Sequence, residues 1–140
     1  MFDTSEMDTS QVLATASDYS IKHDINDIVL ATTKGNTAIA GGDIFRKGSN
    51  IIAVTHSTGF VRENYQELES SVAKKIEEKG IRILTSVMPF HSWNDHYRKR
   101  SGAVMPTTII ADTLRLFGQG TKVCVEIVMM ACDAGMIPQA

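Results

Sequence analysis

Three short apolar segments of this 140-residue sequence end in the same residue, threonine. They are IVLAT, IIAVT and IRILT, which end at Thr32, Thr55 and Thr85. The first two run without a polar break, which is typical of strands buried in a parallel sheet, and segments with helical spacing separate all three. The pattern therefore predicts an α/β fold with a mostly parallel sheet and flanking helices.

The three threonines also indicate where a ligand would bind. Ligands of an open parallel sheet bind outside the carboxyl ends of its strands, so Thr32, Thr55 and Thr85 would place three hydroxyl groups on one rim. The alternative is that threonine ends these strands only because β-branched residues pack well in sheets. The repetition at all three ends favours the rim.

The first strand leads directly into a polar turn, TTKGNT (Thr32–Thr37). We expect a strand at Ile28–Ala31, buried on both faces, and a helix at Thr37–Phe45 with Asn36 or Thr37 as its cap. A strand, a glycine-containing turn and a helix N-terminus present backbone N–H groups and a positive dipole end to an anion. The turn is therefore a candidate phosphate site.

Side chains of the same turn would add to such a site. The hydroxyl groups of Thr32, Thr33 and Thr37 are hydrogen-bond donors, and Lys34 is a counter-charge for phosphate. An ordinary strand–helix loop, rich in small residues, explains the same sequence equally well. Both interpretations stay open at this point.

The N-terminal half contains two further helical patterns. We expect residues 1–8 to be loose or extended and a helix to run from residue 8 or 9 to residue 22 or 23. Val12, Ala16 and Tyr19 lie at helical spacing on one face of this helix, which we expect to be buried. A charged amphipathic helix is expected from residue 63 or 65 to residue 79.

The C-terminal half predicts three helices, at about 91–100, 107–117 and 121–134. In the first, Trp93 and Tyr97 lie four residues apart and are expected to anchor the helix to the body of the protein. In the second, Ile110, Leu114 and Phe117 share one side, which we expect to be buried.

The last helix is apolar on most of its circumference, and its polar residues Lys122, Glu126 and Asp133 form a narrow stripe. Such a helix is buried by a sheet or by a partner subunit. We expect Glu126 to pair with Lys122 or with another neighbour rather than to act in catalysis.

Composition excludes several classes of protein. The net charge of −2 creates no field that would draw the chain to nucleic acid. No apolar run reaches the roughly 20 residues that span a bilayer, and the acidic N-terminus is not a signal peptide. Cys124 and Cys132 form neither a disulfide framework nor a zinc spacing. We expect one cytoplasmic domain over residues 1–140, without nucleic-acid or membrane partners.

Catalytic residues do not emerge from the sequence. No nucleophile, base and orienting residue stand in a known arrangement, and the histidines at positions 23, 56, 91 and 96 show no metal spacing. His56 is the histidine best placed for ligand contact, because it directly follows Thr55 on the expected rim.

Several segments resemble a known family. ATTKGNTA, IIAVT, THSTGF and RLFGQGTKVCVEIVMMACDAGMIP (Arg115–Pro138) are similar to the C-terminal α/β domain of pyruvate kinases and to small stand-alone archaeal and bacterial proteins of that fold. The resemblance covers about Asp27–Pro138. It implies a three-layer α/β fold that binds flavin mononucleotide (FMN) or a similar phosphorylated ligand at the carboxyl ends of the strands.

The resemblance also implies the residues of the site. Phosphate would be held by Thr32, Thr33, Gly35, Asn36 and Thr37. The cleft would be lined by Thr55, His56, Gly59 and Phe60, with Phe60 covering an aromatic ring. Nothing resembles the catalytic barrel of pyruvate kinase, so that activity is not implied.

The sequence departs from this family at both ends. Relatives begin with an additional strand and continue past the equivalent of Pro138 with further strands and another glycine-rich loop. A sheet of about three strands would have exposed edges, which are prone to pairing; a truncated chain, or another subunit that covers the edges, would account for them. We therefore expect a homo-oligomer. An alternative function is a regulatory module that senses a phosphorylated metabolite or only assembles.

Overall fold

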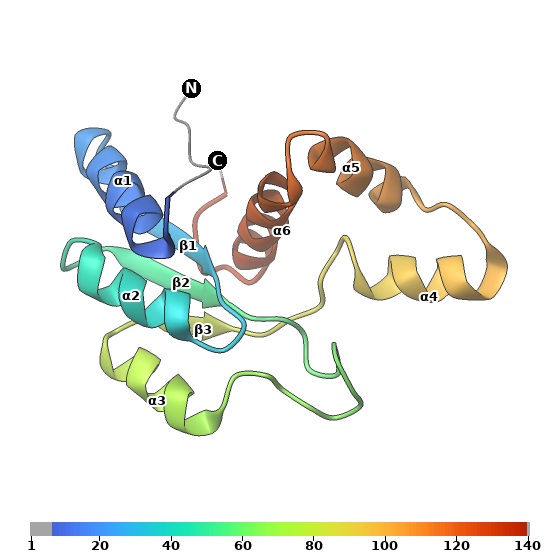
Figure 1. Cartoon of the computed structure of the whole chain (residues 1–140), viewed down its shortest axis with the longest axis horizontal. Coiled ribbons are helices and arrows are strands. Elements are labelled where there is room, and N and C mark those ends of the chain that lie inside the picture. Colours follow the sequence, from blue (N-terminus) through green and yellow to red (C-terminus); the bar gives the residue numbers. More distant parts are fainter. Residues whose placement is uncertain (1–6, 140) are drawn as a thin grey trace. The chain divides into compact units, whose positions relative to one another are not determined.

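The computed structural model describes residues 7–139, apart from the side chains of residues 92–96. Within that range the chain forms three strands and six helices (Figure 1). In chain order these are α1 (Thr9–Lys22), β1 (Asp27–Ala31), α2 (Asn36–Ile44), β2 (Asn50–Val54), α3 (Ser70–Glu78), β3 (Arg82–Leu84), α4 (Ser92–Ser101), α5 (Pro106–Arg115) and α6 (Gln119–Asp133).

The chain divides into two compact units. The first consists of Met1–Thr55 and Glu67–Leu84, and the second of His56–Gln66 and Thr85–Ala140. The expectation that the N-terminus is loose falls mainly on residues 1–6, which lie outside the described residues, as does the side chain of Trp93.

The first unit contains a parallel sheet with the strand order β1-β2-β3. The register pairs Val29 with Ile52 and Ala53 with Ile83. The predicted α/β class with a parallel sheet is therefore confirmed. The strands form where the apolar runs predicted them, because each run pairs in register with its neighbour.

One face of this sheet carries α1, α2 and α3 (Figure 1). Ile51 and Ala53 of β2 point to this face and join the core cluster together with Leu30 of β1, Ala38 of α2 and Ile76 of α3. Side chains alternate between the faces of a strand, so Ile52 and Val54 point the other way. The core of the unit thus lies between the sheet and its three helices.

The strand β1 is less buried than the sequence predicted. Of its residues, only Leu30 is fully buried, whereas β2 is buried from Ile51 to Val54. The expectation that β1 is covered on both faces is wrong. The reason is position in the sheet, because β1 pairs with β2 alone among the described strands and β2 lies in the centre.

Helix α1 begins at Thr9, as expected, because Asp8 caps it. The Asp8 carboxylate accepts a hydrogen bond from the Gln11 backbone N–H, and the Gln11 side-chain oxygen accepts one from the Asp8 N–H, both at 2.9 Å. This reciprocal pair is a capping box, which satisfies two N–H groups that the helix itself leaves unpaired.

The buried face of α1 differs from the expected one. Leu13, Ser17 and Ser20 are its buried residues, and the Ser17 hydroxyl donates to the carbonyl oxygen of Ile44 in α2. Buried hydroxyl groups need such partners, and these two serines have them. The small serines therefore face the neighbouring helix.

Val12, Ala16 and Tyr19 are exposed, so the prediction that they form the buried face is wrong. They line an open apolar groove of about 550 Å³ along α1 and β1, together with residues of both elements. Their helical spacing is real, but it marks this groove rather than the core.

Helix α3 begins at Ser70, later than the predicted start at residue 63 or 65. Residues between β2 and α3 form turns instead, and Asn64 adopts a left-handed backbone conformation with φ of 57°. A left-handed residue interrupts a right-handed helix. The Arg62 guanidinium lies 4.1 Å from the centre of the Tyr65 ring, which supports the turn.

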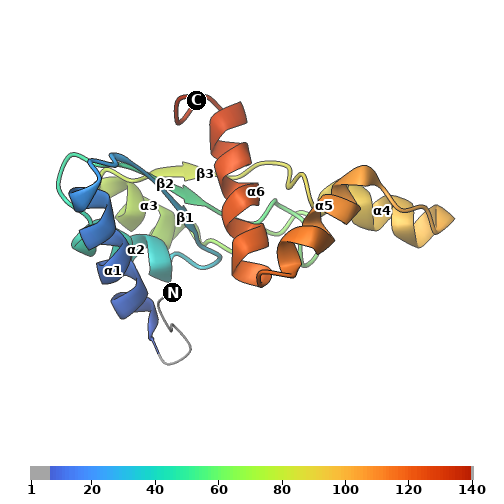
Figure 2. The same ribbon diagram turned by 90° about the horizontal axis from the view of Figure 1, so that it is seen from above.

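The second unit contains α4, α5 and α6, with α5 packed against α6 (Figure 2). In α5, Ala111 is buried while Ile110 and Phe117 are exposed and Leu114 is half-buried, so the predicted buried side is wrong. Tyr97 of α4 is also exposed, and the side chain of Trp93, the other expected anchor, lies outside the described residues.

Helix α6 buries its charged pair and leaves part of its apolar surface exposed. Lys122 and Glu126 are 3% and 1% exposed, whereas the apolar residues Val125, Val128 and Met129 are exposed. Lys122 and Glu126 are buried as an ion pair, so their charges satisfy each other inside the unit. The expected pairing of Glu126 with Lys122 is confirmed.

No helix within residues 7–139 combines the length and the apolar character needed to cross a membrane.

Candidate functional site

The carboxyl ends of β1 and β2 lie side by side. The Thr32 N–H donates to the carbonyl oxygen of Val54, and the Thr55 N–H donates to that of Leu84, each at 2.9 Å. The ladder thus continues one residue past each strand and brings Thr32 and Thr55 to the same edge of the sheet, as predicted. Thr85 is exposed and belongs to the second unit.

Both threonines are buried rather than displayed on a rim. Thr32 is 5% exposed and Thr55 is 3% exposed. The Thr32 hydroxyl oxygen accepts a hydrogen bond of 3.1 Å from the Gly35 N–H. Thr32 therefore closes the turn between β1 and α2, since its side chain satisfies a backbone group of that turn.

Gly35 is required by conformation and by packing. Its φ is +96°, in the left-handed region, and a Cβ atom there would lie 2.4 Å from Cγ1 of Val72 in α3. The side chains of Leu68 and Ile76 lie 3.1 Å from the same point. Glycine is the residue that satisfies both constraints. The Gly35 N–H is also already bonded to Thr32, so it shapes the turn.

The N-terminus of α2 has no side-chain cap among the described residues. The helix begins at Asn36, and its cap position is Gly35, which has no side chain to donate or accept. The prediction that Asn36 or Thr37 caps the helix is therefore wrong. The first N–H groups of a helix have no partner within it, so those of residues 36–38 remain directed out of the helix end.

The surroundings of this helix end are polar and carry a positive charge. Lys34 and Asn36 are exposed, and Thr33 and Thr37 are half-buried. Within residues 7–139, Lys34 forms no ion pair. The positive end of the α2 dipole and the Lys34 ammonium therefore reinforce each other, an arrangement that favours an anion.

The other predicted site residues belong to the second unit. The Gly59 N–H donates to the Tyr65 carbonyl oxygen at 2.9 Å. The Phe60 ring stacks on His56 with ring centres 4.1 Å apart, and it also contacts the His91 ring at 4.8 Å. These residues form an aromatic cluster, which His91 joins from a different loop of the sequence.

The second unit also contains a small polar cavity that sequence reasoning missed. It has a volume of about 70 Å³ and lies among α4, α5 and the loop before α4. Two of its lining residues, Arg98 and Arg115, come from different helices. Their convergence depends on how the helices pack, which residue spacing does not reveal.

Among the side chains that the structure describes, no group of three His, Cys, Asp or Glu residues comes together as a metal site. A scan of the sequence against known protein families finds no match.

Proposed function

We propose that this protein binds a phosphorylated small molecule at the turn between β1 and α2. The observation that carries the proposal is the uncapped N-terminus of α2, which directly follows a parallel strand. Such a helix end offers backbone donors and a positive dipole end at the sheet edge where ligands of α/β folds bind. A phosphate group is the ligand that best matches both features.

The donors of the proposed site come from a few residues. The backbone N–H groups of Asn36, Thr37 and residue 38 would bind phosphate oxygens, and the hydroxyls of Thr33 and Thr37 would add to them. Lys34 would supply charge. Thr32 and Gly35 have a different role, because their mutual hydrogen bond holds the turn in shape.

FMN is the specific ligand that we propose, on the basis of the resemblance to pyruvate kinase C-terminal domain-like proteins. The turn suits its phosphate group. When bound, FMN would supply a ring that accepts or donates electrons. We propose that Phe60 covers the flavin ring. Phe60 contacts the rings of His56 and His91, so the flavin ring would stack beside these rings or in place of them. The proposal includes the three-layer fold of that family and a cytoplasmic location, and assigns no catalytic residue.

Equilibrium dialysis with FMN and with riboflavin tests the proposal, because riboflavin lacks only the phosphate. FMN should bind at least about tenfold more tightly, as expected for a few charge-assisted hydrogen bonds. The Thr37→Val variant, which keeps the shape of the side chain, should weaken FMN binding about tenfold. Thr15→Val changes the same residue type in α1 and should leave binding unaltered.

A second pair of variants tests the charge. Lys34→Gln should weaken FMN binding about two- to fivefold, as expected for an exposed charge. Lys47→Gln removes the same charge from another exposed position of the first unit and should have no such effect. Equal binding of FMN and riboflavin, or equal effects of the Lys34 and Lys47 variants, would contradict the proposal.

An assembly role is a second candidate function, and it is favoured by the exposed apolar residues of the second unit. Leu116 and Phe117, between α5 and α6, are 83% and 76% exposed, and Val125, Val128 and Met129 are exposed along α6. Exposed apolar groups of this extent mark interaction surfaces. We propose that the partner is a second copy of this chain and that binding of a phosphorylated ligand regulates this assembly.

A further inference from the structure

A small polar cavity in the second unit has the features of an anion site. Its volume is about 70 Å³. It is lined by Phe90, His91, Arg98, Thr108, Ala111, Asp112 and Arg115. The cavity thus suits one small polar group rather than a whole cofactor.

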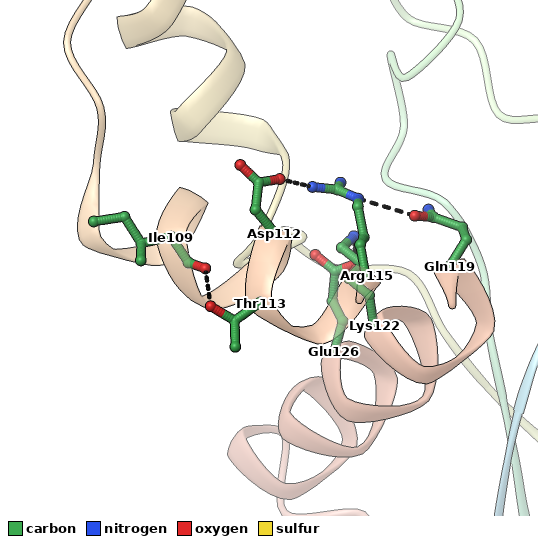
Figure 3. Close-up of polar contacts among 7 residues, drawn as sticks. All are labelled: Ile109, Asp112, Thr113, Arg115, Gln119, Lys122 and Glu126. Carbon is green, nitrogen blue, oxygen red and sulfur yellow. Dashed lines mark hydrogen bonds and ion pairs between the residues drawn. The ribbon is translucent and has the colours of Figure 1, made fainter. Parts of the chain in front are cut away.

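Hydrogen bonds fix the orientation of Arg115 at this cavity. Its Nη1 donates to the Asp112 carboxylate at 2.6 Å, and its Nε donates to the Gln119 side-chain oxygen at 3.0 Å (Figure 3). Within residues 7–139, its bonds use these two nitrogens and leave Nη2 for another acceptor. A donor held in advance loses little conformational freedom when a ligand binds.

The remaining polar groups approach from other elements. Arg98 comes from α4, and Thr108 lies in the first turn of α5, whose N-terminus has no side-chain cap among the described residues. His91 comes from the loop before α4, where its N–H donates to the Met88 carbonyl oxygen and its ring contacts Phe60. Three separate segments therefore direct donors into one small space.

The charges of the lining favour an anion. Arg98 and Arg115 contribute two positive charges, and Asp112 contributes one negative charge that is already paired with Arg115. The N-terminal end of α5 adds a positive dipole end beside these two arginines. Arginine is also the residue best suited to bind oxyanions, through its planar set of donors.

We propose that this cavity is a second oxyanion site, which binds inorganic phosphate or the phosphate group of a small ligand. Arg98 and Arg115 supply the charge, and Thr108 and His91 supply hydrogen bonds. A tetrahedral phosphate fits better than a carboxylate, because donors from three segments can each meet an oxygen that points in a different direction. The proposal does not depend on the turn between β1 and α2.

Isothermal titration calorimetry with inorganic phosphate, at fixed ionic strength and in the full chain, tests this site. The titration uses a Lys34→Gln, Thr37→Val background, which weakens the site proposed in the first unit. Arg115→Gln in that background should lower the phosphate affinity at least about tenfold, since a charged hydrogen bond is lost. Arg100→Gln is the matched control, because it removes the same charge from an exposed position of α4, and it should change the affinity less than about twofold.

A second variant covers the case in which Arg115→Gln does not fold. Thr108→Val keeps the contacts of Arg115 with Asp112 and Gln119, and it should weaken phosphate binding about threefold to tenfold. Equal affinities of the Arg115 or Thr108 variant and the Arg100 control would overturn the proposal. Displacement of phosphate by an equal concentration of acetate would overturn its assignment to phosphate. Neither outcome bears on FMN binding by the unmodified turn, so the two proposals fail separately.

Discussion

The hydroxyl oxygen of Thr32 accepts a hydrogen bond from the Gly35 N–H over 3.1 Å, which closes the turn between β1 and α2 on itself. The side chain that ends the strand thus positions the residue that precedes the helix. Because Gly35 has no side chain, it also leaves the end of α2 uncapped among the described residues. The hydrogen bond therefore stabilises the turn, and the lack of a side-chain cap at Gly35 leaves the N–H donors of the proposed phosphate site exposed.

Gly35→Ala should destabilise the first unit by about 2–4 kcal/mol. The new Cβ would lie 2.4 Å from Cγ1 of Val72, and the backbone has a φ of +96°. Overpacking carries a free-energy cost of about 1–3 kcal/mol, and a left-handed conformation carries one of about 1–2 kcal/mol. Urea denaturation followed by circular dichroism measures the change in the free energy of unfolding.

Gly48→Ala is the control for this prediction. Its φ of +92° is similar, but no atom lies within 4 Å of the added Cβ. It should therefore show only the conformational cost, about 1–2 kcal/mol. If both alanine variants lose the same stability, packing against α3 is not the reason for Gly35.

Glu126→Ala should destabilise the second unit by about 3–5 kcal/mol. Glu126 accepts hydrogen bonds from the Phe90 N–H, at 2.7 Å, and from the Lys122 ammonium. Its removal leaves a buried charge without a partner. Thermal and urea unfolding measure the loss, and the double variant Lys122→Met, Glu126→Leu should recover most of it. A single variant as stable as the unmodified protein would show that the pair is not buried in solution.

Asp8→Ala should destabilise α1 by about 0.5–2 kcal/mol, since it removes the carboxylate half of the capping box. Asp18→Ala changes an exposed aspartate in the middle of the same helix and should have little effect or a slightly stabilising one. Native-state hydrogen exchange of the α1 amides measures both. Equal exchange in the two variants would argue against the cap.

Met129→Asp should dissociate the proposed oligomer, because it places a charge in the exposed apolar surface of α6. Thr121→Asp adds the same charge at an exposed polar position of the helix and should leave the assembly intact. Light scattering coupled to size-exclusion chromatography gives the mass of each. A monomeric unmodified protein at micromolar concentration would contradict the assembly role.

The α/β class and all three strands could be predicted from the sequence, because the apolar runs are short and regularly spaced. The turn at Thr32–Thr37 could also be placed, since strand and helix signals flank it. The internal structure of this turn could not be predicted. The role of Gly35 depends on Val72, which lies far away in the sequence and reaches the turn only when α3 packs.

The helix faces were the least predictable feature. In α6, Lys122 and Glu126 form a polar stripe on an otherwise apolar helix, and this pair of opposite charges one turn apart is buried together. In α1, the apolar residues around Tyr19 face a groove while small serines face the core. Pattern counting ignores such compensation, so it located α1 and α6 without giving their buried sides.

We propose that the turn between β1 and α2 binds a phosphorylated ligand, with FMN as the specific case. The most direct test of this binding is the visible absorption spectrum of the protein after incubation with FMN and gel filtration, with Thr37→Val run in parallel. Binding predicts that the flavin absorption elutes with the unmodified protein and is strongly reduced for the variant. A colourless protein peak, or equal flavin absorption in both samples, would contradict FMN binding at this turn.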